Sequence, residues 1–535
     1  MSHTRRRAPR VAVAAALALC VLSSELVSGP LRASAGASLA PAGRVEILGH
    51  GDGPGIGMGQ WGDFGYAVRY HLSYAAILGH YYGGTSETTL TALGQSTEPT
   101  LSVLIMENLN LKNNVGYDTV VTSPSAYSIE STSATGATTT TSTTTTSTTT
   151  TTPGSSTTTT QPVATTTTVP AGSISVPAGE AVDLRLASNG TWNAYEAGSC
   201  AAASAATTGT PVATGLLDPV VVPASTDASA PASELLTLCR HDGVDETLRG
   251  EIEAFDRQGY ERTLNLVGLD EYLDGVVPAE ESASWGADGG TAGAPQGEAW
   301  GFQALEAQAV AARSYALAYA AAGGWNGYAN ICDDTYCQAY VGEGFENPLS
   351  SLAVADTTGE VLITANTTSV VEARYAASTG GYTAPSAFGA VPDLGDACVV
   401  PGVTLECNPV HSWHITVSPR AISRHWPAIG TLVQLRVIRR DHDGAWGGRS
   451  LEVVIIGRRA RRTVSGAVFA SDLSLDSDWF AFRITRIRPR SGSSATTTST
   501  APSTTTTSTS TTLPTTATST TSTTTASTAP STTVP

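Results

Sequence analysis

The chain has 535 residues, and its 46 Asp and Glu against 29 Lys and Arg give it a formal net charge of −17. An acidic chain of this kind repels the phosphate backbone of nucleic acids and anionic lipid headgroups, so we expect neither as a partner. No apolar run reaches the roughly 18 residues of a membrane-spanning helix, and no Gly-X-Y period predicts collagen.

The first 35 residues have the pattern of a secretory signal peptide. Three arginines at positions 5–7 precede an apolar stretch at 11–22, which is too short to span a bilayer, and a small-x-small sequence ends at Ala35. We expect cleavage after Ala35, export to the extracellular space or cell wall, and no integral membrane segment in the mature chain. Cys20 lies in the apolar stretch, but Leu19 stands where a lipoprotein signal would have Gly or Ala, which disfavours a lipid anchor.

Two tracts rich in Thr and Ser divide the rest of the chain. Residues 131–179 and 491–535 contain no charged side chain. Such segments bury too little apolar surface to offset their ordering entropy, so we expect disordered, mucin-like spacers. Two globular segments remain: residues 45–130 before the first tract and residues 180–490 between the two tracts.

The segment 180–490 combines strand and helix patterns. Residues 263–267 and 432–437 alternate with period two, and residues 451–456 form a continuous apolar run that predicts a buried strand. Residues 298–322 are rich in Ala, keep helical spacing and end before Gly323 and Gly324, which predicts the main helix. We therefore expect an α+β fold in which a mixed sheet body carries an Ala-rich helix.

The cysteines indicate disulfides. Of the seven, Cys20 leaves with the signal peptide, and six remain as neighbouring pairs. The Cys-x4-Cys spacing of the second pair also suits zinc, with His411 and His414 far downstream, but no local His completes a tetrahedral site. In an oxidising compartment we predict no bound metal and three disulfides: Cys200–Cys239, Cys332–Cys337 and Cys398–Cys407.

The first candidate for chemistry is the sequence YLDGVVPAEESASW at residues 272–285. We interpret the apolar run before Pro278 as strand-like, with Glu280 and Glu281 at its end and Trp285 close behind. A carboxyl group beside apolar surface has its charged form disfavoured, so it can stay protonated and act as a general acid on a glycosidic oxygen. The alternative is a solvated or ion-paired carboxylate pair.

The second candidate is the glycine-rich stretch at residues 49–62. Glycine at nearly every other position permits positive φ and close approach to a ligand or another strand. The stretch is neither a Walker loop nor the GxGxxG dinucleotide fingerprint. It is either a turn-rich strand that packs under a helix or one wall of a groove, where His50, Gln60 and Trp61 contact a substrate.

Seven segments, in chain order, resemble the SpoIID/LytB family, which comprises stage II sporulation protein D and the amidase enhancer. The segments are GIGMGQWGDFGYA (55–67), ILGHYYGGT (77–85), YLDGVVPAEESASW (272–285), GFQALEAQAVAARSYAL (301–317), ICDDTYCQAYVG (331–342), ASTGGYT (377–383) and TVSGAVF…SDWF (463–480).

The resemblance implies a role in peptidoglycan without a cofactor. Members either cut glycan strands as lytic transglycosylases or enhance an N-acetylmuramoyl-L-alanine amidase, so glycan strands and a cell-wall amidase are the expected partners. It makes Glu280 the catalytic acid, which then serves as the base while the sugar's own sixth-carbon hydroxyl captures the oxocarbenium-like centre. The substrate-binding residues that the motifs indicate are His50, Gln60, Trp61, Trp285, Arg313, Ser378 and His411.

The chain departs from the family pattern at three positions. Glu281 stands where the family often has Met, and a neighbouring carboxylate raises the pKa of one of the two. Pro54 and Tyr336 stand where His is frequent, which weakens any metal site. A mainly structural wall protein on glycosylated stalks is a third hypothesis beside the enzyme and the enhancer.

Overall fold

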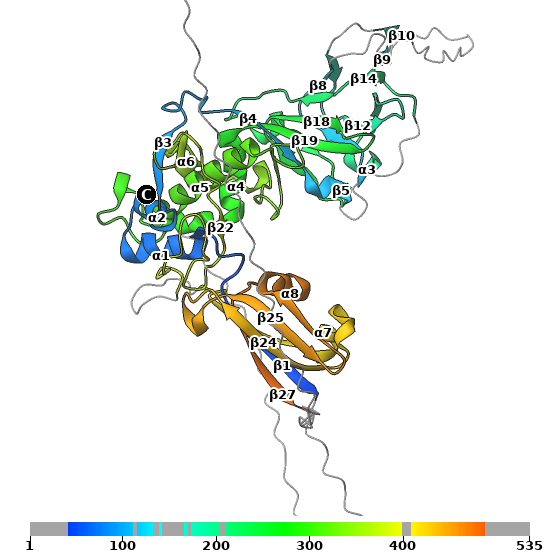
Figure 1. The fold of residues 1–535 in the computed structure, drawn as a ribbon. Helices are drawn as coiled ribbons and strands as arrows, with labels where there is room; N and C mark the ends of the chain where they lie inside the picture. Colours follow the sequence, from blue (N-terminus) through cyan, green and yellow to red (C-terminus); the bar gives the residue numbers. More distant parts are fainter. Residues whose placement is uncertain are drawn as a thin grey trace, which may run out of the picture. The chain divides into compact units, whose positions relative to one another are not determined.

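The computed structural model describes residues 41–110, 115–131, 138–141, 165–168, 173–203, 209–397 and 408–486. These residues form both helices and sheets, with long runs of strands between the helices (Figure 1), which confirms the predicted α+β fold. The expected signal peptide and the tract at 491–535 lie outside the described residues. Within them, no helix combines the length and apolarity that crossing a membrane would require.

Helix α5 is the centre of the helical part of the fold. Residues 302–316 are all buried, because helices pack around α5 on several sides and its many alanines let their backbones approach closely. The helix starts at Phe302 rather than at the predicted Glu298, since Gly301 caps it and Pro295–Gly297 forms a separate 3-10 turn. The helices are α1 (Gln60–Tyr70), α2 (Tyr74–Tyr81), α3 (Cys200–Ala203), α4 (Leu269–Glu280), α5 (Phe302–Ala321), α6 (Pro348–Asp356), α7 (Pro419–His425) and α8 (Gly466–Leu473).

The segment before Glu280 is a helix, and its interpretation as strand-like was wrong. Pro278 lies in the last turn of α4, and the hydrogen bond that its missing N–H cannot make to the carbonyl of residue 274 is lost only two residues before the helix ends. The buried apolar residues also follow a helical period: Leu269, Tyr272, Leu273, Val276 and Val277. Glu280 therefore lies at a helix C-terminus.

Two large sheets are built from strands that lie between α2 and α4 in the sequence, with β20 added from the chain after α5. The first has the order β11 (Ile174–Val176), β8 (Tyr127–Glu130), β15 (Val220–Val222), β18 (Glu251–Asp256), β19 (Glu261–Gly268), β4 (Thr100–Leu104) and β20 (Ile331–Cys332). The second has the order β10 (Thr165–Thr168), β9 (Thr138–Thr141), β14 (Ala213–Leu216), β13 (Trp192–Glu196), β12 (Ala181–Leu186), β7 (Thr119–Thr122), β16 (Leu236–Leu238) and β17 (Glu246–Leu248). Strand β19 confirms the strand predicted at 263–267.

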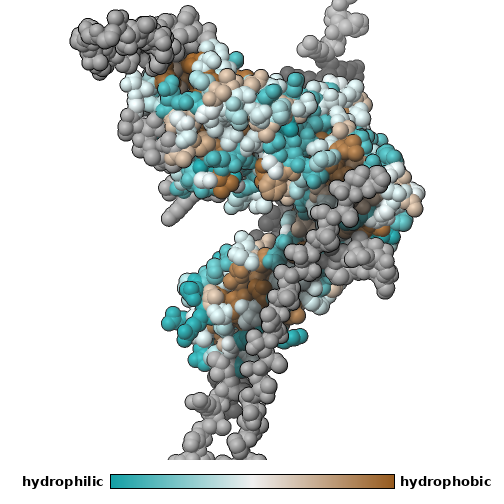
Figure 2. Space-filling model, turned by 180° about the vertical axis from the view of Figure 1, so that it is seen from behind, coloured by the Kyte–Doolittle hydropathy of each residue, from teal (hydrophilic) through white to brown (hydrophobic). Residues whose placement is uncertain are grey.

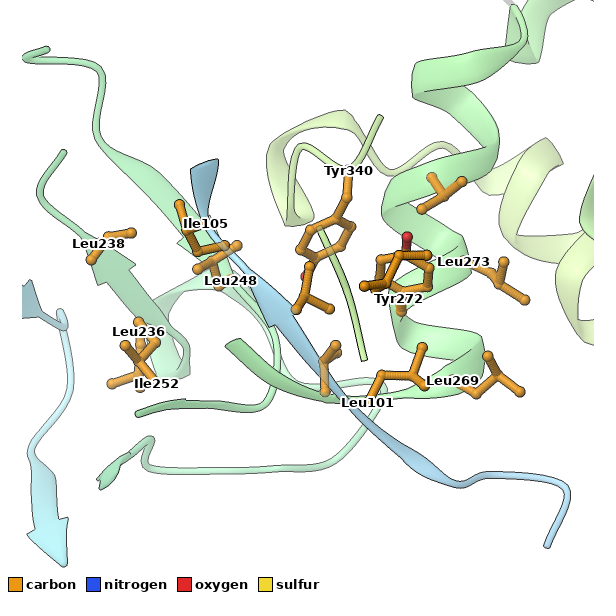
Figure 3. Packing of buried hydrophobic residues seen from close by; sticks show 14 of the residues in the cluster. Leu101, Ile105, Leu236, Leu238, Leu248, Ile252, Leu269, Tyr272, Leu273 and Tyr340 are labelled. Atoms are coloured by element: carbon orange, nitrogen blue, oxygen red, sulfur yellow. The ribbon is translucent and has the colours of Figure 1, made fainter. Parts of the chain in front are cut away.

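The core of these sheets continues into α4. In Figure 3, Leu101 and Ile105 from the chain around β4 lie between the side chains of β16 to β18 and those of α4, and the ring of Tyr340 lies beside Tyr272. The centroids of these two rings are 5.0 Å apart. One apolar cluster thus fixes α4, and with it Glu280, against the first sheet.

Parts of the Thr/Ser tract expected to be disordered are strands. Thr138–Thr141 pairs antiparallel with Thr165–Thr168, and Ile174–Val176 joins β8. Thr is β-branched and favours extended backbone, so a hairpin is open to it even without a large apolar surface. The remaining residues of the stretch at 132–172 lie outside the described residues.

The strand β1 (Ala42–His50) pairs with strands from the far end of the chain, between β23 (Ser412–Val417) and β27 (Phe480–Arg486). Beside this three-stranded sheet lies another one, of β24 (Leu432–Arg440), β25 (Ser450–Gly457) and β26 (Arg461–Ser465). Strands β24 and β25 confirm the two predicted here, although β25 alternates between buried and half-buried residues instead of being buried throughout. Short pairs complete the fold: β2 (Met58–Gly59) with β22 (Tyr375–Ala376), β3 (Thr85–Thr89) with β21 (Glu360–Thr364), and β5 (Leu109–Asn110) with β6 (Val115–Gly116).

Two of the three predicted disulfides are present. Cys200 pairs with Cys239 across 39 residues, and Cys332 pairs with Cys337 across five. The second bond excludes these thiols from zinc coordination, because a disulfide sulfur is no thiolate ligand. Cys398 and Cys407 lie outside the described residues.

Candidate functional site

Glu280 is partly buried at the end of α4, with one hydrogen-bond donor on each carboxyl oxygen. Its Oε1 accepts from the backbone N–H of Ala339 at 2.6 Å, and its Oε2 accepts from Nε2 of Gln60 at 3.3 Å. Burial raises the pKa of Glu280, and the two hydrogen bonds offset part of that rise. The result is a carboxyl group that keeps its proton to higher pH than an exposed Glu.

The glycine-rich stretch positions Gln60. The chain turns through Gly51, Gly53, Gly55 and Gly57, all with positive φ, before β2 pairs in parallel with β22. A Cβ at Gly57 would overlap the carbonyl oxygen of Arg374, so the chain can pass this close only as glycine. Gln60 follows as the first residue of α1 and reaches Glu280 from there.

The same stretch also lines two adjoining pockets. Ile56 borders both a pocket of about 510 Å³, beside Arg374 and Phe388, and one of about 530 Å³, beside Arg449 and Asp476. The stretch is therefore turn-rich and lines both pockets, but the residues expected to contact a substrate there, His50, Gln60 and Trp61, are not among the lining residues. The residues that line these two pockets do not include Glu280.

A buried polar layer supports the backbone that holds Glu280. Gln338, next to Ala339, accepts a hydrogen bond from Tyr272 Oη at 3.2 Å and donates to Tyr375 Oη at 2.8 Å. It also donates to the carbonyl of Ala312 in α5 at 3.2 Å. These residues were missed in the sequence. The signal that could have indicated them is the disulfide loop, which ends at Cys337 immediately before Gln338.

Two further carboxyl groups are fully buried near this site. Asp63, one turn after Gln60 in α1, and Glu281 interact directly, and a proton on one carboxyl group would let it donate to the other. Burial raises the pKa of Asp63 well above its usual value and that of Glu281 to about 8. The pKa of buried Asp393, which accepts from Thr379 Oγ1 at 2.7 Å, rises to about 7. The departure from the family pattern at Glu281 therefore has a partner on α1.

Trp61 and Trp285 pack against each other, with ring centroids 4.6 Å apart. Phe64 stacks on Trp285 at 4.4 Å, and only 7% of Trp285 is exposed. Trp61 is half-buried and keeps part of its ring at the surface. Of the two predicted sugar-binding tryptophans, Trp61 is thus the more exposed.

His50, Ser378 and His411 lie together, but around Asp396 and not around Glu280. Asp396 Oδ1 accepts from Ser378 Oγ at 2.7 Å, and its Oδ2 lies 2.6 Å from His411 Nδ1. The hydrogen bond to Asp396 raises the pKa of His411. His50 contacts His411 edge-on, with ring centroids 5.8 Å apart. The predicted set therefore divides into two groups, and Asp396 was missed.

Arg313 is fully buried inside the helical core. Its guanidinium donates two hydrogen bonds to Asp270 Oδ1 and one each to Thr357 Oγ1, Val354 O and Glu360 O. All five donors are thus used to join α4, α5 and α6. Substrate contact by Arg313 stays a prediction, and the proposal below does not use it.

Residues 257–363 match the family model SpoIID, described as Stage II sporulation protein. This confirms the predicted resemblance over a segment that contains Glu280, Trp285 and the Cys332–Cys337 pair. No curated protein and no solved structure matches the chain.

Proposed function

Because residues 257–363 are a SpoIID domain, we propose that this protein remodels peptidoglycan outside the cell as a lytic transglycosylase. The observation that carries the proposal is Glu280, a partly buried carboxyl group with a raised pKa and a donor on each oxygen. The SpoIID family is cell-wall and sporulation-related. The signal-peptide pattern and the two disulfides support export.

One carboxyl group serves both steps of the proposed reaction. Protonated Glu280 gives its proton to the oxygen between N-acetylmuramic acid and N-acetylglucosamine, and the bond from that oxygen to the muramic anomeric carbon breaks. The Glu280 carboxylate then takes the proton of the sixth-carbon hydroxyl, whose oxygen bonds to the same anomeric carbon. Glu280 ends protonated, the product is a 1,6-anhydro sugar, and no water is consumed.

The hydrogen bonds on Glu280 suit these alternating roles. The Ala339 N–H and the Gln60 amide stabilise the carboxylate that forms after the first proton transfer, while burial favours the neutral acid that starts it. Neither donor belongs to a cation, so the carboxyl group is not held permanently ionised by a salt bridge.

The experiment is digestion of purified peptidoglycan with wild type and Glu280→Gln, followed by mass spectrometry of the fragments. Wild type is expected to release 1,6-anhydromuramic products, and the variant to release them about 10²–10⁴-fold more slowly, because a positioned acid contributes about that much. Glycan stripped of stem peptides should be included as a substrate. Absence of anhydro products from every substrate would remove the enzymatic proposal.

A non-catalytic enhancer of a cell-wall amidase is the second candidate. It is favoured by one observation, that the pockets beside Ile56 are lined by residues other than Glu280. In that case a purified amidase accelerates equally on addition of wild type or Glu280→Gln, and neither protein releases anhydro products alone.

A further inference from the structure

The acidic net charge of the chain conceals a basic body at its C-terminal end. Residues 408–486 contain 12 arginines against six acidic residues, while the other residues contain 17 basic and 40 acidic ones. Helix α7 and the strands β24, β26 and β27 carry nine of these arginines, and the other three, Arg449, Arg458 and Arg459, lie in the connections on either side of β25. In Figure 2, hydrophilic residues gather along the margins of this body, the lower one in the view.

Four of the arginines line one groove of about 1070 Å³. Arg420 and Arg424 come from α7, and Arg458 and Arg459 come from the turn between β25 and β26. The other lining residues are small or apolar, with two serines and a threonine, and none of the lining residues is acidic. The groove therefore presents positive charge from two opposed elements.

The backbone holds both groups of arginines in place. Arg420 and Arg424 are one turn apart in α7, whose first turn is capped by Ser418. The N–H groups of Arg458 and Arg459 donate to the carbonyls of Thr431 and Ile429, each at 2.9 Å. Spacing between the two sides is therefore set by the fold and does not depend on flexible side chains alone.

Gly430 brings one of these side chains close to the backbone. It has φ +69°, and a Cβ built on it would lie 2.9 Å from Cγ of Arg459. The aliphatic part of Arg459 thus rests on a glycine, while its guanidinium stays exposed.

These four guanidiniums have no ion-pair partner among the described residues. Carboxylates of this body pair with other arginines instead: Glu452 with Arg439, and Asp478 with Arg449. All four groove arginines are exposed. Four like charges around one groove repel each other, and a bound anion would relieve that repulsion.

We propose that this groove binds a flexible polymer of phosphate groups, with the guanidiniums of Arg420, Arg424, Arg458 and Arg459 on successive phosphates. Guanidinium forks match phosphate oxygens in pairs, and a repeating anion satisfies several at once. The chain's own Thr/Ser tracts are uncharged and do not complement the groove. A rigid nucleic-acid duplex is disfavoured by the 40 acidic residues elsewhere.

The test uses fluorescently labelled inorganic polyphosphate and the secreted chain carrying Glu280→Gln, so that binding is measured apart from any glycan cleavage. Arg458→Gln/Arg459→Gln is expected to weaken binding at least tenfold, because it removes half of the groove charge. Arg439→Gln/Arg483→Gln is the matched control. It removes two exposed arginines of the same body that already face Glu452 and Glu46, and it should change the Kd less than twofold. Circular dichroism melts are used to check that both variants fold.

Competitors separate recognition of a flexible phosphate polymer from general attraction to negative charge. Polyglutamate of equal charge, duplex DNA and vesicles of phosphatidylglycerol should each compete at least tenfold less well than unlabelled polyphosphate. Equal or better competition by any of them overturns the proposal, as does equal weakening in the two arginine variants. Light scattering that shows a dimer lost only in Arg458→Gln/Arg459→Gln would also overturn it, by assigning the groove to a second copy of the chain.

Discussion

At the scale of single residues, the paired carboxyl groups of Asp63 and Glu281 have the clearest consequence. Asp63 lies one turn from Gln60 in α1 and Glu281 follows Glu280 in the chain, so the interaction of the pair helps to hold Gln60 against the proposed acid. Two buried negative charges without a proton would repel each other across that joint. The state of this pair should therefore affect both stability and the geometry at Glu280.

This pair predicts a pH dependence of stability. The pKa of Glu281 rises from 4.5 to about 8 on folding, so the folded protein binds this proton more tightly than the unfolded chain. The stabilisation is complete below about 4.5 and is lost as the pH rises toward 8. Wild type should melt at progressively lower temperature between pH 5 and 8, and Glu281→Gln should flatten that decline. A variant whose melting temperature falls as steeply as that of wild type would contradict this role.

At the scale of elements, close backbone approach at glycines decides where the site residues lie. Gly57 passes against Arg374 on the way to Gln60, and Gly301 passes against the carbonyl of Trp285 at the start of α5. At both places a Cβ would overlap a backbone atom. The glycine pattern was visible in the sequence, but the partner that each glycine approaches was not, because that partner comes from another element.

Gly57→Ala should therefore damage the site through its supporting strand. The new Cβ meets the Arg374 carbonyl at a residue with positive φ, so we expect the free energy of unfolding to fall by about 1–3 kcal/mol. We also expect the variant that is still folded to cleave glycan more slowly than wild type. Gly79→Ala in α2 is the control. Nothing lies within 4 Å of its Cβ, and Ala should stabilise the helix by about 0.5–1 kcal/mol. Chemical denaturation and product release measure the two effects.

Secondary structure was predictable from the sequence wherever one period dominated. Strands β19, β24 and β25 and the Ala-rich helix all lie where alternation or helical spacing indicated them. The run before Glu280 was misjudged because Pro278 and two adjacent valines outweighed a helical repeat that starts at Leu269. Proline removes one hydrogen bond of a helix, and at Pro278 that loss falls two residues before the helix ends, so its presence did not exclude a helix.

At the scale of the whole molecule, the two disulfides have different tasks. Cys200–Cys239 closes 39 residues, and chain entropy gives such a loop about 4 kcal/mol of stabilisation. Cys332–Cys337 closes only five and ends beside Gln338 and Ala339, the backbone that holds Glu280. The first bond constrains the unfolded chain, while the second orders the site.

Removal of each disulfide should separate these tasks. Cys200→Ser/Cys239→Ser is expected to lower unfolding free energy by about 4 kcal/mol while the folded fraction keeps its rate of glycan cleavage. Cys332→Ser/Cys337→Ser is expected to cost about 2 kcal/mol and to slow cleavage in protein that is still folded. Equal rates per folded molecule in the two variants would show that the short loop does not order Glu280. Denaturant titration and the digestion assay provide the measurements.

Charge also has to be judged at this scale. The net charge of −17 argues against polyanionic partners when it is averaged over the chain. The fold concentrates unpaired arginines from α7 and from the β25–β26 turn at one groove, so the local potential has the opposite sign. Attraction of a ligand depends on the nearest charges within about a Debye length and not on the sum over 535 residues.

The sequence by itself determined the composition-driven properties: the α+β class, the local cysteine pairs and Glu280 as the strongest candidate acid. These depend on residue types and on spacings of a few positions. The tertiary structure alone decided which groups meet: Gln60 with Glu280 across 220 residues, Asp63 with Glu281, and Asp396 with His411. Such contacts depend on how elements distant in sequence pack, and no local pattern encodes that geometry.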